Sequence, residues 1–138
     1  MEWVIRGALA RNRRPGYKKI GDRKTVDRDG VGPWLEEVQA NGIRGILCLL
    51  EASELDLYDW LPGGLLEWYR AQGFQVEHVP IPDHACPIAT DDQLRLARAA
   101  HERLPTPVLI HCSAGQGRTG AVIKFLQSSP DVRGGEGE

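Results

Sequence analysis

The ten residues from His111 to Gly120 constrain the fold of this chain more than any other stretch. They follow a short apolar run, Val108 to Ile110, and precede a helix-like run, Ala121 to Leu126. The predicted order is therefore a strand, a tight glycine-containing loop and a helix. Such a loop directs its backbone N–H groups inward, and the positive end of the helix dipole lies behind them. The segment predicts a cradle for an anion.

Three residue types make this cradle reactive as well as anion-binding. Cys112 is the first residue of the loop, where N–H dipoles and the helix terminus should lower its thiol pKa and give a thiolate at neutral pH. Arg118 opens the helix and can hold two oxygens of an oxyanion with its planar guanidinium. Gly115, Gly117 and Gly120 allow unusual backbone angles and close approach of a ligand. A thiolate, an anion nest and a bidentate arginine together indicate phosphoryl transfer through a phosphocysteine.

The spacing H-C-x-x-G-x-x-R-[S/T]-G resembles the phosphate loop of the cysteine-based protein tyrosine phosphatase superfamily, in its compact dual-specificity branch. The matching positions are His111, Cys112, Gly115, Arg118, Thr119 and Gly120. The resemblance implies catalytic roles for Cys112, Arg118 and Thr119, with the Thr119 hydroxyl bonded to the Cys112 sulfur during hydrolysis. It also implies that His111 supports the loop and does not act as a base. The residues expected to bind the substrate phosphate are Ser113, Ala114, Gly115, Gln116, Gly117 and Arg118.

Cleavage of a phosphate ester also needs an acid, because the leaving alkoxide or phenoxide must take up a proton. Asp83 is the best candidate, since it lies in a stiff loop, Pro80 to Pro87, between a predicted strand and a predicted helix. The pattern P-D-H-x-x-P in this loop resembles the acid loop of tyrosine phosphatases, which gives His84 a supporting role. Asp91 and Asp92 are the alternative acids, but they lie where a helix should start.

Strand-like and helix-like segments alternate along the chain. Helices are expected over 33–42, 62–72 and 92–103, with Thr90 or Asp91 as the cap of the last, and strands over 3–5, 43–50, 75–79 and 108–110. The first strand can continue after Gly7 to Ala10. This alternation predicts an α/β fold with a central, mostly parallel sheet of four to five strands flanked by helices, phosphatase-like and C-terminally shortened. We expect one domain over 1–129 and a short Gly/Glu-rich tail over 130–138.

Two connecting segments carry unbalanced charge. The segment from Arg11 to Arg28 holds eight basic residues against Asp22 and Asp27, and its weak periodicity predicts mostly loop. It is either a solvated loop or a cationic rim that attracts an anionic substrate toward Cys112. The segment from Glu51 to Leu61 is interpreted as an acidic connector.

Composition narrows the function classes. The formal net charge of −2 gives no general attraction to nucleic acid or to anionic membranes. No apolar run is long enough for a signal peptide or a membrane span, so we expect a cytoplasmic protein. The three cysteines and four histidines show no disulfide framework and no metal-ligand spacing, so we expect no metal and no cofactor. Cys48 should be a core residue, and Cys86 could form a protective disulfide with Cys112 if the acid loop closes.

The expected function is hydrolysis of phosphate monoesters in phosphorylated proteins or peptides, at phosphotyrosine and also at phosphoserine or phosphothreonine. The uncharged loop residues Ser113, Ala114 and Gln116 favour a phosphoprotein over an inositol lipid as substrate. In the superfamily that the motif resembles, members that act on phosphoinositides commonly have basic residues at these positions. Two alternatives stay open. One is a phosphatase for a non-protein polyanion, either a phosphoinositide or an RNA 5′-phosphate. The other is a catalytically weak phosphate-binding pseudophosphatase.

Overall fold

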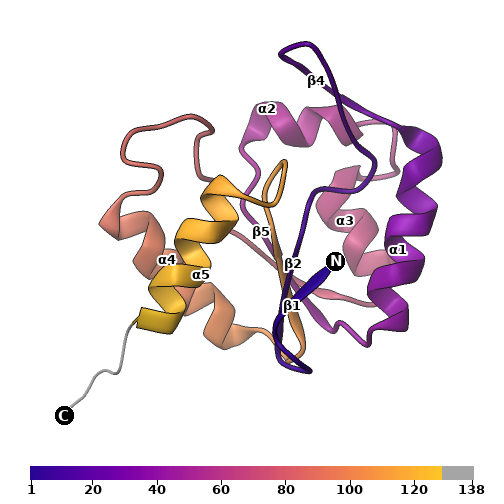
Figure 1. The fold of residues 1–138 in the computed structure, drawn as a ribbon. Coiled ribbons are helices and arrows are strands. Elements are labelled where there is room, and N and C mark those ends of the chain that lie inside the picture. Colours follow the sequence, from indigo (N-terminus) through magenta and orange to yellow (C-terminus); the bar gives the residue numbers. More distant parts are fainter. Residues whose placement is uncertain (129–138) are drawn as a thin grey trace.

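A computed structural model describes residues 1–128, and its centre is one five-stranded sheet (Figure 1). The strands are β1 (Glu2–Ile5), β2 (Leu9–Asn12), β5 (Gly45–Cys48), β6 (Gln75–His78) and β7 (Val108–His111). They lie in the order β1-β2-β7-β5-β6, and every neighbouring pair is parallel except β1 with β2. The predicted mostly parallel sheet of four to five strands is therefore confirmed. The predicted tail, 130–138, lies outside the described residues.

Helices cover both faces of this sheet. They are α1 (Val31–Ala40), α2 (Ala52–Leu55), α3 (Gly64–Ala71), α4 (Asp91–Arg103) and α5 (Gly117–Ser128), with the 3-10 turns η1 (Arg28–Gly30) and η2 (Asp56–Tyr58). Helices α4 and α5 pack on one face, and α1 and α3 pack on the other (Figure 1). Because β5 and β7 lie between the two layers, all their residues are buried. Strands covered on both faces need apolar side chains throughout, as the sequence of β5 indicates.

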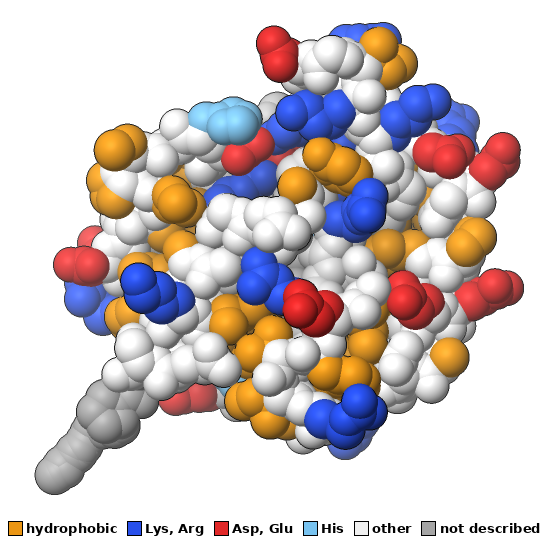
Figure 2. Space-filling model, in the orientation of Figure 1, with side chains coloured by type: hydrophobic (Ala, Val, Ile, Leu, Met, Phe, Trp, Pro, Cys, Tyr) orange, Lys and Arg blue, Asp and Glu red, His pale blue; other side chains and the backbone are white. Residues whose placement is uncertain are grey.

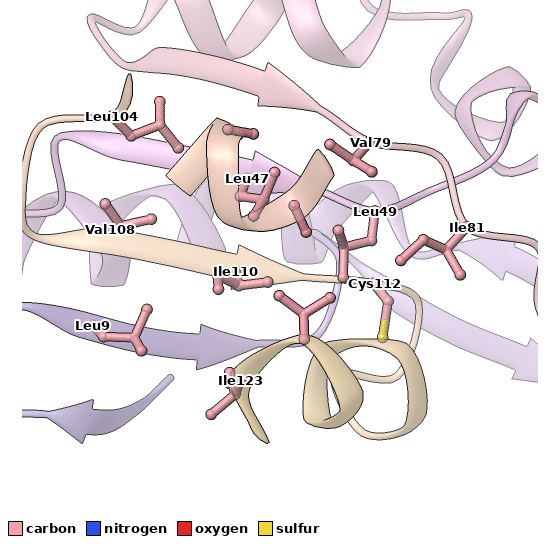
Figure 3. Packing of buried hydrophobic residues seen from close by; sticks show 13 residues of the cluster. Leu9, Leu47, Leu49, Val79, Ile81, Leu104, Val108, Ile110, Cys112 and Ile123 are labelled. Atoms are coloured by element: carbon pink, nitrogen blue, oxygen red, sulfur yellow. The ribbon is translucent and has the colours of Figure 1, made fainter. Parts of the chain in front are cut away.

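The core under α4 and α5 extends to the carboxyl end of β7. In Figure 3, Leu9, Leu47 and Ile110 project from neighbouring strands toward this layer, and Ile123 of α5 packs against them. Cys112 lies at the edge of the same cluster, with its sulfur directed toward the loop that leads into α5 (Figure 3). The apolar core thus fixes where β7 ends and where the next helix begins.

The first strand departs from its predicted extent. β1 ends at Ile5, and the chain reverses through Gly7, whose φ is +78°. The Ala8 N–H donates to the Ile5 carbonyl oxygen at 2.9 Å, and β2 then returns antiparallel to β1. A single strand continuing to Ala10 is therefore wrong, because glycine permits a left-handed turn at this position.

Two predicted connectors also contain regular structure. The basic segment forms a hairpin of β3 (Tyr17–Ile20) and β4 (Arg23–Val26), which turns at Gly21 with φ +60°. The prediction of mostly loop is wrong here, since exposed lysines replace the alternating apolar residues that normally indicate strands. The acidic connector contains α2 and η2, which are too short for helical periodicity to be visible.

The remaining predicted helices are confirmed with small shifts of their ends. Thr90 is the N-cap of α4, where its hydroxyl oxygen accepts a hydrogen bond from the Gln93 N–H at 3.1 Å. Within residues 1–128, none of the helices combines the length and apolar character that crossing a bilayer requires.

Candidate active site

In the loop between β7 and α5, carbonyl oxygens accept hydrogen bonds from Arg11, whereas the backbone N–H groups of the described loop donate none. The guanidinium of Arg11, on β2, donates to the Gly115 carbonyl oxygen at 2.8 Å and to that of Gln116 at 3.3 Å. In residues 1–128, the N–H groups of residues 113–116 have no hydrogen-bond acceptor. In a planar trans peptide the N–H and the C=O point in opposite directions. Since these carbonyls point toward Arg11, the N–H groups of the same peptides point away from Arg11. This geometry supports the predicted anion cradle.

Gly115 is the position at which the loop needs glycine. Its φ is +79°, and a Cβ there would lie 2.6 Å from the Asn12 carbonyl oxygen and 2.9 Å from the Arg13 nitrogen. Both atoms belong to the backbone at the end of β2, so neither can move aside easily. The requirement therefore combines left-handed conformation with close backbone contact.

The loop forms the floor of a pocket of about 290 Å³. The lining residues are Tyr17, Lys19, Asp22, Lys24, Asp83, His84, Ala85, Ile88, Cys112, Ser113, Ala114, Gly117 and Arg118. The fold thus brings Cys112, Arg118 and Asp83 to one cavity. The basic hairpin supplies the opposite wall, and Figure 2 shows Lys and Arg side chains grouped over that part of the molecule. This placement supports the cationic rim over the solvated loop.

Arg118 is buried and paired with a carboxylate that the sequence did not indicate. Its two terminal nitrogens donate to the Glu54 oxygens at 2.6 and 2.7 Å, and one also donates to the Ile81 carbonyl oxygen at 2.9 Å. Its Nε has no acceptor in the part of the chain that the structure describes. The edge formed by Nε and the second terminal nitrogen is therefore available to a bidentate oxyanion.

Glu54 is only 2% exposed and lies in α2, in the predicted acidic connector. Burial disfavours its ionised form, but hydrogen bonds from Arg118 and Lys24 outweigh that cost and hold the pKa of Glu54 below its usual value. Its carboxylate also accepts from the Glu51 N–H at 3.0 Å, which completes a capping box. The usual capping-box pattern begins with Ser or Thr, so neither this box nor the pairing of Glu54 with Arg118 was predicted from the sequence.

Asp83 is held at the pocket by Lys24 of β4. The Lys24 ammonium donates to Asp83 Oδ2 at 2.5 Å and to Glu54 Oε2 at 2.7 Å, while the Asp83 N–H donates to Glu51 Oε2 at 2.9 Å. Burial raises the pKa of Asp83, but the Lys24 hydrogen bond and the nearby Arg118 charge outweigh it, so the pKa lies below its usual value. Asp83 is therefore ionised at neutral pH when the pocket is empty.

His111 is a neutral, fully buried support beneath the loop. Burial lowers its pKa to about 4. Its Nδ1 is 3.0 Å from the Cys112 carbonyl oxygen and its Nε2 is 2.8 Å from the Tyr69 hydroxyl. Since a carbonyl only accepts, Nδ1 carries the proton and Nε2 accepts from Tyr69. This arrangement supports the predicted structural role of His111.

The remaining predicted site residues differ in how close they lie to the Cys112 pocket. The Thr119 hydroxyl is buried and has no hydrogen-bond partner among residues 1–128, so its bond to Cys112 stays a prediction. Gly115 and Gln116 line an adjoining hollow on the Arg11 side of the loop. His84 is exposed, with Nε2 3.4 Å from Asp83 Oδ2.

Neither Asp91 nor Asp92, the alternative acids, is among the residues that line the Cys112 pocket; both lie in the first turn of α4. Cys48 is buried in the core as predicted, and burial raises its pKa to about 12. Cys86 is an exposed free thiol, so its disulfide with Cys112 also stays a prediction.

A cysteine and an arginine around free N–H groups, at the carboxyl end of a parallel strand, define the class of cysteine-based tyrosine and dual-specificity phosphatases. The family model described as "Polymorphic toxin system, DSP-PTPase phosphatase" matches residues 20–127. The chain belongs to that phosphatase family.

Known proteins similar to this chain fall in the same class. The human tyrosine-protein phosphatase non-receptor type 12 is 44% identical over 52 residues, which are 36% of this chain and 7% of that protein. The chain thus spans a small part of that relative. The structure of kinase associated phosphatase, with its catalytic-site cysteine replaced by serine, has a TM-score of 0.58 and 26% identity over 91% of this chain and 68% of that one. The structure of a mutant form of Tk-PTP has a TM-score of 0.54 and 28% identity over 94% and 73% of the two chains.

Proposed function

We propose that the protein is a phosphatase that hydrolyses phosphate monoesters through a phosphocysteine at Cys112. The observation that carries the proposal is one pocket joining the Cys112 thiol, the open edge of Arg118 and the Asp83 carboxyl above unused N–H groups. The three parts match nucleophile, oxyanion clamp and acid in an in-line displacement at phosphorus.

The reaction would take two steps. The Cys112 thiolate attacks phosphorus, a P–S bond forms, the P–O bond to the leaving group breaks, and Asp83 gives that oxygen its proton. Water then attacks phosphorus, Asp83 takes a proton from it, and the P–S bond breaks to restore the thiolate and release phosphate. The Thr119 hydroxyl follows Arg118 and has no hydrogen-bond partner within the described residues, so it can bond to the departing sulfur. Arg118 and the N–H groups hold the phosphoryl oxygens in both steps.

Asp83 must be protonated to start this reaction, although it is ionised in the empty pocket. A phosphate dianion beside Arg118 would offset the positive charges that lower the pKa of Asp83. Substrate binding therefore favours the protonated acid, and the proton is present when the leaving group needs it.

Phosphotyrosine in a protein or peptide is the substrate that the pocket walls support best, with phosphoserine and phosphothreonine as further substrates. Tyr17 and Ile88 contribute apolar surface above the loop. The Tyr17 ring is held beneath the guanidinium groups of Arg13 and Arg14, 5.4 and 5.1 Å from its centroid. A fixed aromatic wall suits the flat ring of an aryl phosphate.

A non-protein polyanion is the second candidate, and Lys19 on the pocket wall is the observation that favours it. Lys19 has no ion pair among residues 1–128 and can contact a second negative group of an RNA 5′-end or a phosphoinositide. A pseudophosphatase is the third reading, and turnover assays separate it from both.

Turnover of para-nitrophenyl phosphate by wild type, Cys112→Ser and Asp83→Ala tests the proposal. We expect wild-type hydrolysis, none with Cys112→Ser, and a reduced kcat with Asp83→Ala. Hydrolysis that survives Cys112→Ser, or none in any variant, would contradict it. The kcat/KM values on phosphotyrosine peptide, phosphoserine peptide, phosphoinositide and 5′-phosphorylated RNA then rank the substrate classes.

A further inference from the structure

Arg14 is a fully buried cation directly against the phosphate loop. It is 0% exposed. Its Nε donates to the Ser113 hydroxyl at 3.0 Å, and its terminal nitrogens donate to the Tyr58 hydroxyl at 3.3 Å and to the Lys18 carbonyl oxygen at 3.1 Å. All three acceptors are uncharged. The Tyr58 hydroxyl stays protonated, because burial raises its pKa to about 12 and its proton is donated to the Pro15 carbonyl oxygen.

No carboxylate oxygen lies within 4.0 Å of Arg14 in residues 1–128. Neutral acceptors and the face of the Tyr17 ring, 5.1 Å away, contact the guanidinium but supply no negative charge to balance it. Burying such a charge is strongly unfavourable, as for a buried ion that has lost its partner. A buried arginine of this kind needs an anion, and no carboxylate in the described part of the chain supplies it.

The two cations and two carboxylates in contact beside the pocket compensate one another: Arg118 and Lys24 pair with Glu54 and Asp83. His111 is neutral. Arg11 also contacts the loop, and Lys19 lines the pocket wall, but both side chains are partly or fully exposed, so water screens their charge. Arg14 is therefore a buried surplus positive charge next to the loop.

The surplus charge contacts the residue that follows the nucleophile. The Arg14 N–H donates to the Ser113 carbonyl oxygen at 2.9 Å, in addition to the bond from its Nε to the hydroxyl of the same residue. Ser113 follows Cys112 directly. The first bond fixes the Arg14 backbone and the second fixes its guanidinium relative to the cradle, so no reorganisation is needed when negative charge arrives.

We infer that Arg14 is the buried counter-charge of the anion held by the phosphate loop, first the Cys112 thiolate and then the substrate phosphoryl group. Arg14 does not itself line the pocket, whereas Ser113 does, so Arg14 is a positioning residue that acts through Ser113 and through its charge. The inference rests on the proposed function for the identity of the nucleophile.

The test is the rate of Cys112 alkylation by iodoacetamide at about pH 6, because only the thiolate reacts. A Cys86→Ser background removes the exposed competing thiol. We expect Arg14→Met and Arg14→Gln to react about tenfold more slowly, which corresponds to about 1.4 kcal/mol. Arg14→Lys keeps the charge and should stay within about threefold of wild type. Arg13→Met is the matched control, since Arg13 is exposed, stacks on the same Tyr17 ring and has no bond to Ser113.

Two features make the outcome decisive. If Arg14→Met does not fold, Arg14→Gln decides, because its amide can keep the bond to Ser113 without the charge. Inorganic phosphate should also protect Cys112 from alkylation at lower concentration in wild type than in Arg14→Gln. Equal alkylation and equal protection in both proteins would overturn the inference. The alkylation assay needs no turnover, so an inactive wild type would refute the proposed function and leave this result readable.

Discussion

At the scale of single residues, the site depends on buried polar groups whose partners come from distant parts of the chain. Glu54 lies 64 residues before Arg118, and its carboxylate fixes the guanidinium so that one edge faces the pocket. The Tyr69 hydroxyl fixes the His111 tautomer, and His111 in turn supports the Cys112 carbonyl. Each of these bonds is a place where one substitution should have a large and specific effect.

Replacing Glu54 with glutamine should destabilise the fold and disorder Arg118. The change leaves Arg118 and Lys24 without their shared buried carboxylate, which we expect to cost about 3 kcal/mol. Urea unfolding measures the cost, and kcat/KM should fall in parallel. The control is Glu67→Gln, because Glu67 forms an exposed pair with Arg70 that should contribute no more than about 0.5 kcal/mol. An equal effect of both substitutions would contradict the role of Glu54.

Protonation of His111 should make stability depend on pH. The pKa is about 4 in the folded chain and 6.5 as the reference value, so the unfolded state binds the proton first. The stabilisation is therefore present above about pH 6.5 and is lost as pH falls toward 4, by up to about 3 kcal/mol. Urea unfolding of wild type and His111→Asn at several pH values checks this. The variant should be less stable at neutral pH and show a smaller loss over this window; parallel curves would count against it.

Replacing Gly115 with alanine should disrupt the loop. The left-handed φ and the contact with the backbone at the end of β2 together predict a loss of at least about 2 kcal/mol, and loss of turnover. Gly117→Ala is the matched control in the same loop, since a Cβ there meets no atom within 4 Å. Its unfolding free energy should change by less than about 0.5 kcal/mol. A stable and active Gly115→Ala protein would show that the loop has room that the structure does not indicate.

At the scale of elements, the β3–β4 hairpin is the part that converts an anion cradle into a walled pocket. It contributes Tyr17, Lys19 and Lys24 to the pocket lining. Within residues 1–128, Lys24 is the hairpin residue that forms an ion pair with the acid loop, through Asp83. It also pairs with Glu54 of α2. The hairpin therefore positions the acid as well as shaping the mouth of the pocket.

Replacing Lys24 with methionine should release the acid loop and raise the pKa of Asp83 toward its usual value. We expect kcat/KM on a phosphotyrosine peptide to fall between about 10-fold and 100-fold, because the acid loses its fixed position. The alkaline limb of the pH–rate profile should move to higher pH, since Asp83 would keep its proton longer. Lys18→Met removes the same charge from the exposed side of the same hairpin and should change neither quantity. A Lys24→Met profile identical to wild type would contradict this coupling.

At the scale of the whole molecule, the features that could be predicted from the sequence are those formed by residues close together in the chain. The β7 strand, the loop and α5 are contiguous, so their order and the cradle could be predicted from the residues between Val108 and Leu126. Contacts between distant segments could not be predicted. Nothing in an exposed, lysine-rich hairpin indicates that Lys24 reaches Asp83, 59 residues away.

The same limit applies to charge. In the sequence, Arg14 is one of eight basic residues in a segment interpreted as loop, and Glu54 is one of several acids in a connector. Their burial follows from packing under the loop and behind Arg118, which a single sequence does not encode in any local pattern. The chemistry-bearing motif was predictable, whereas the buried charges that hold it in place required the fold.

The central claim, a covalent phosphocysteine at Cys112, is tested most directly by acid-quenched mass spectrometry. Asp83→Asn is incubated with para-nitrophenyl phosphate, whose good leaving group allows transfer while the lost base slows hydrolysis. We predict that the protein gains the mass of one phosphoryl group, that peptide mapping assigns it to Cys112, and that Cys112→Ser gains nothing. Phosphate release without an adduct, or an adduct on another residue, would contradict the claim.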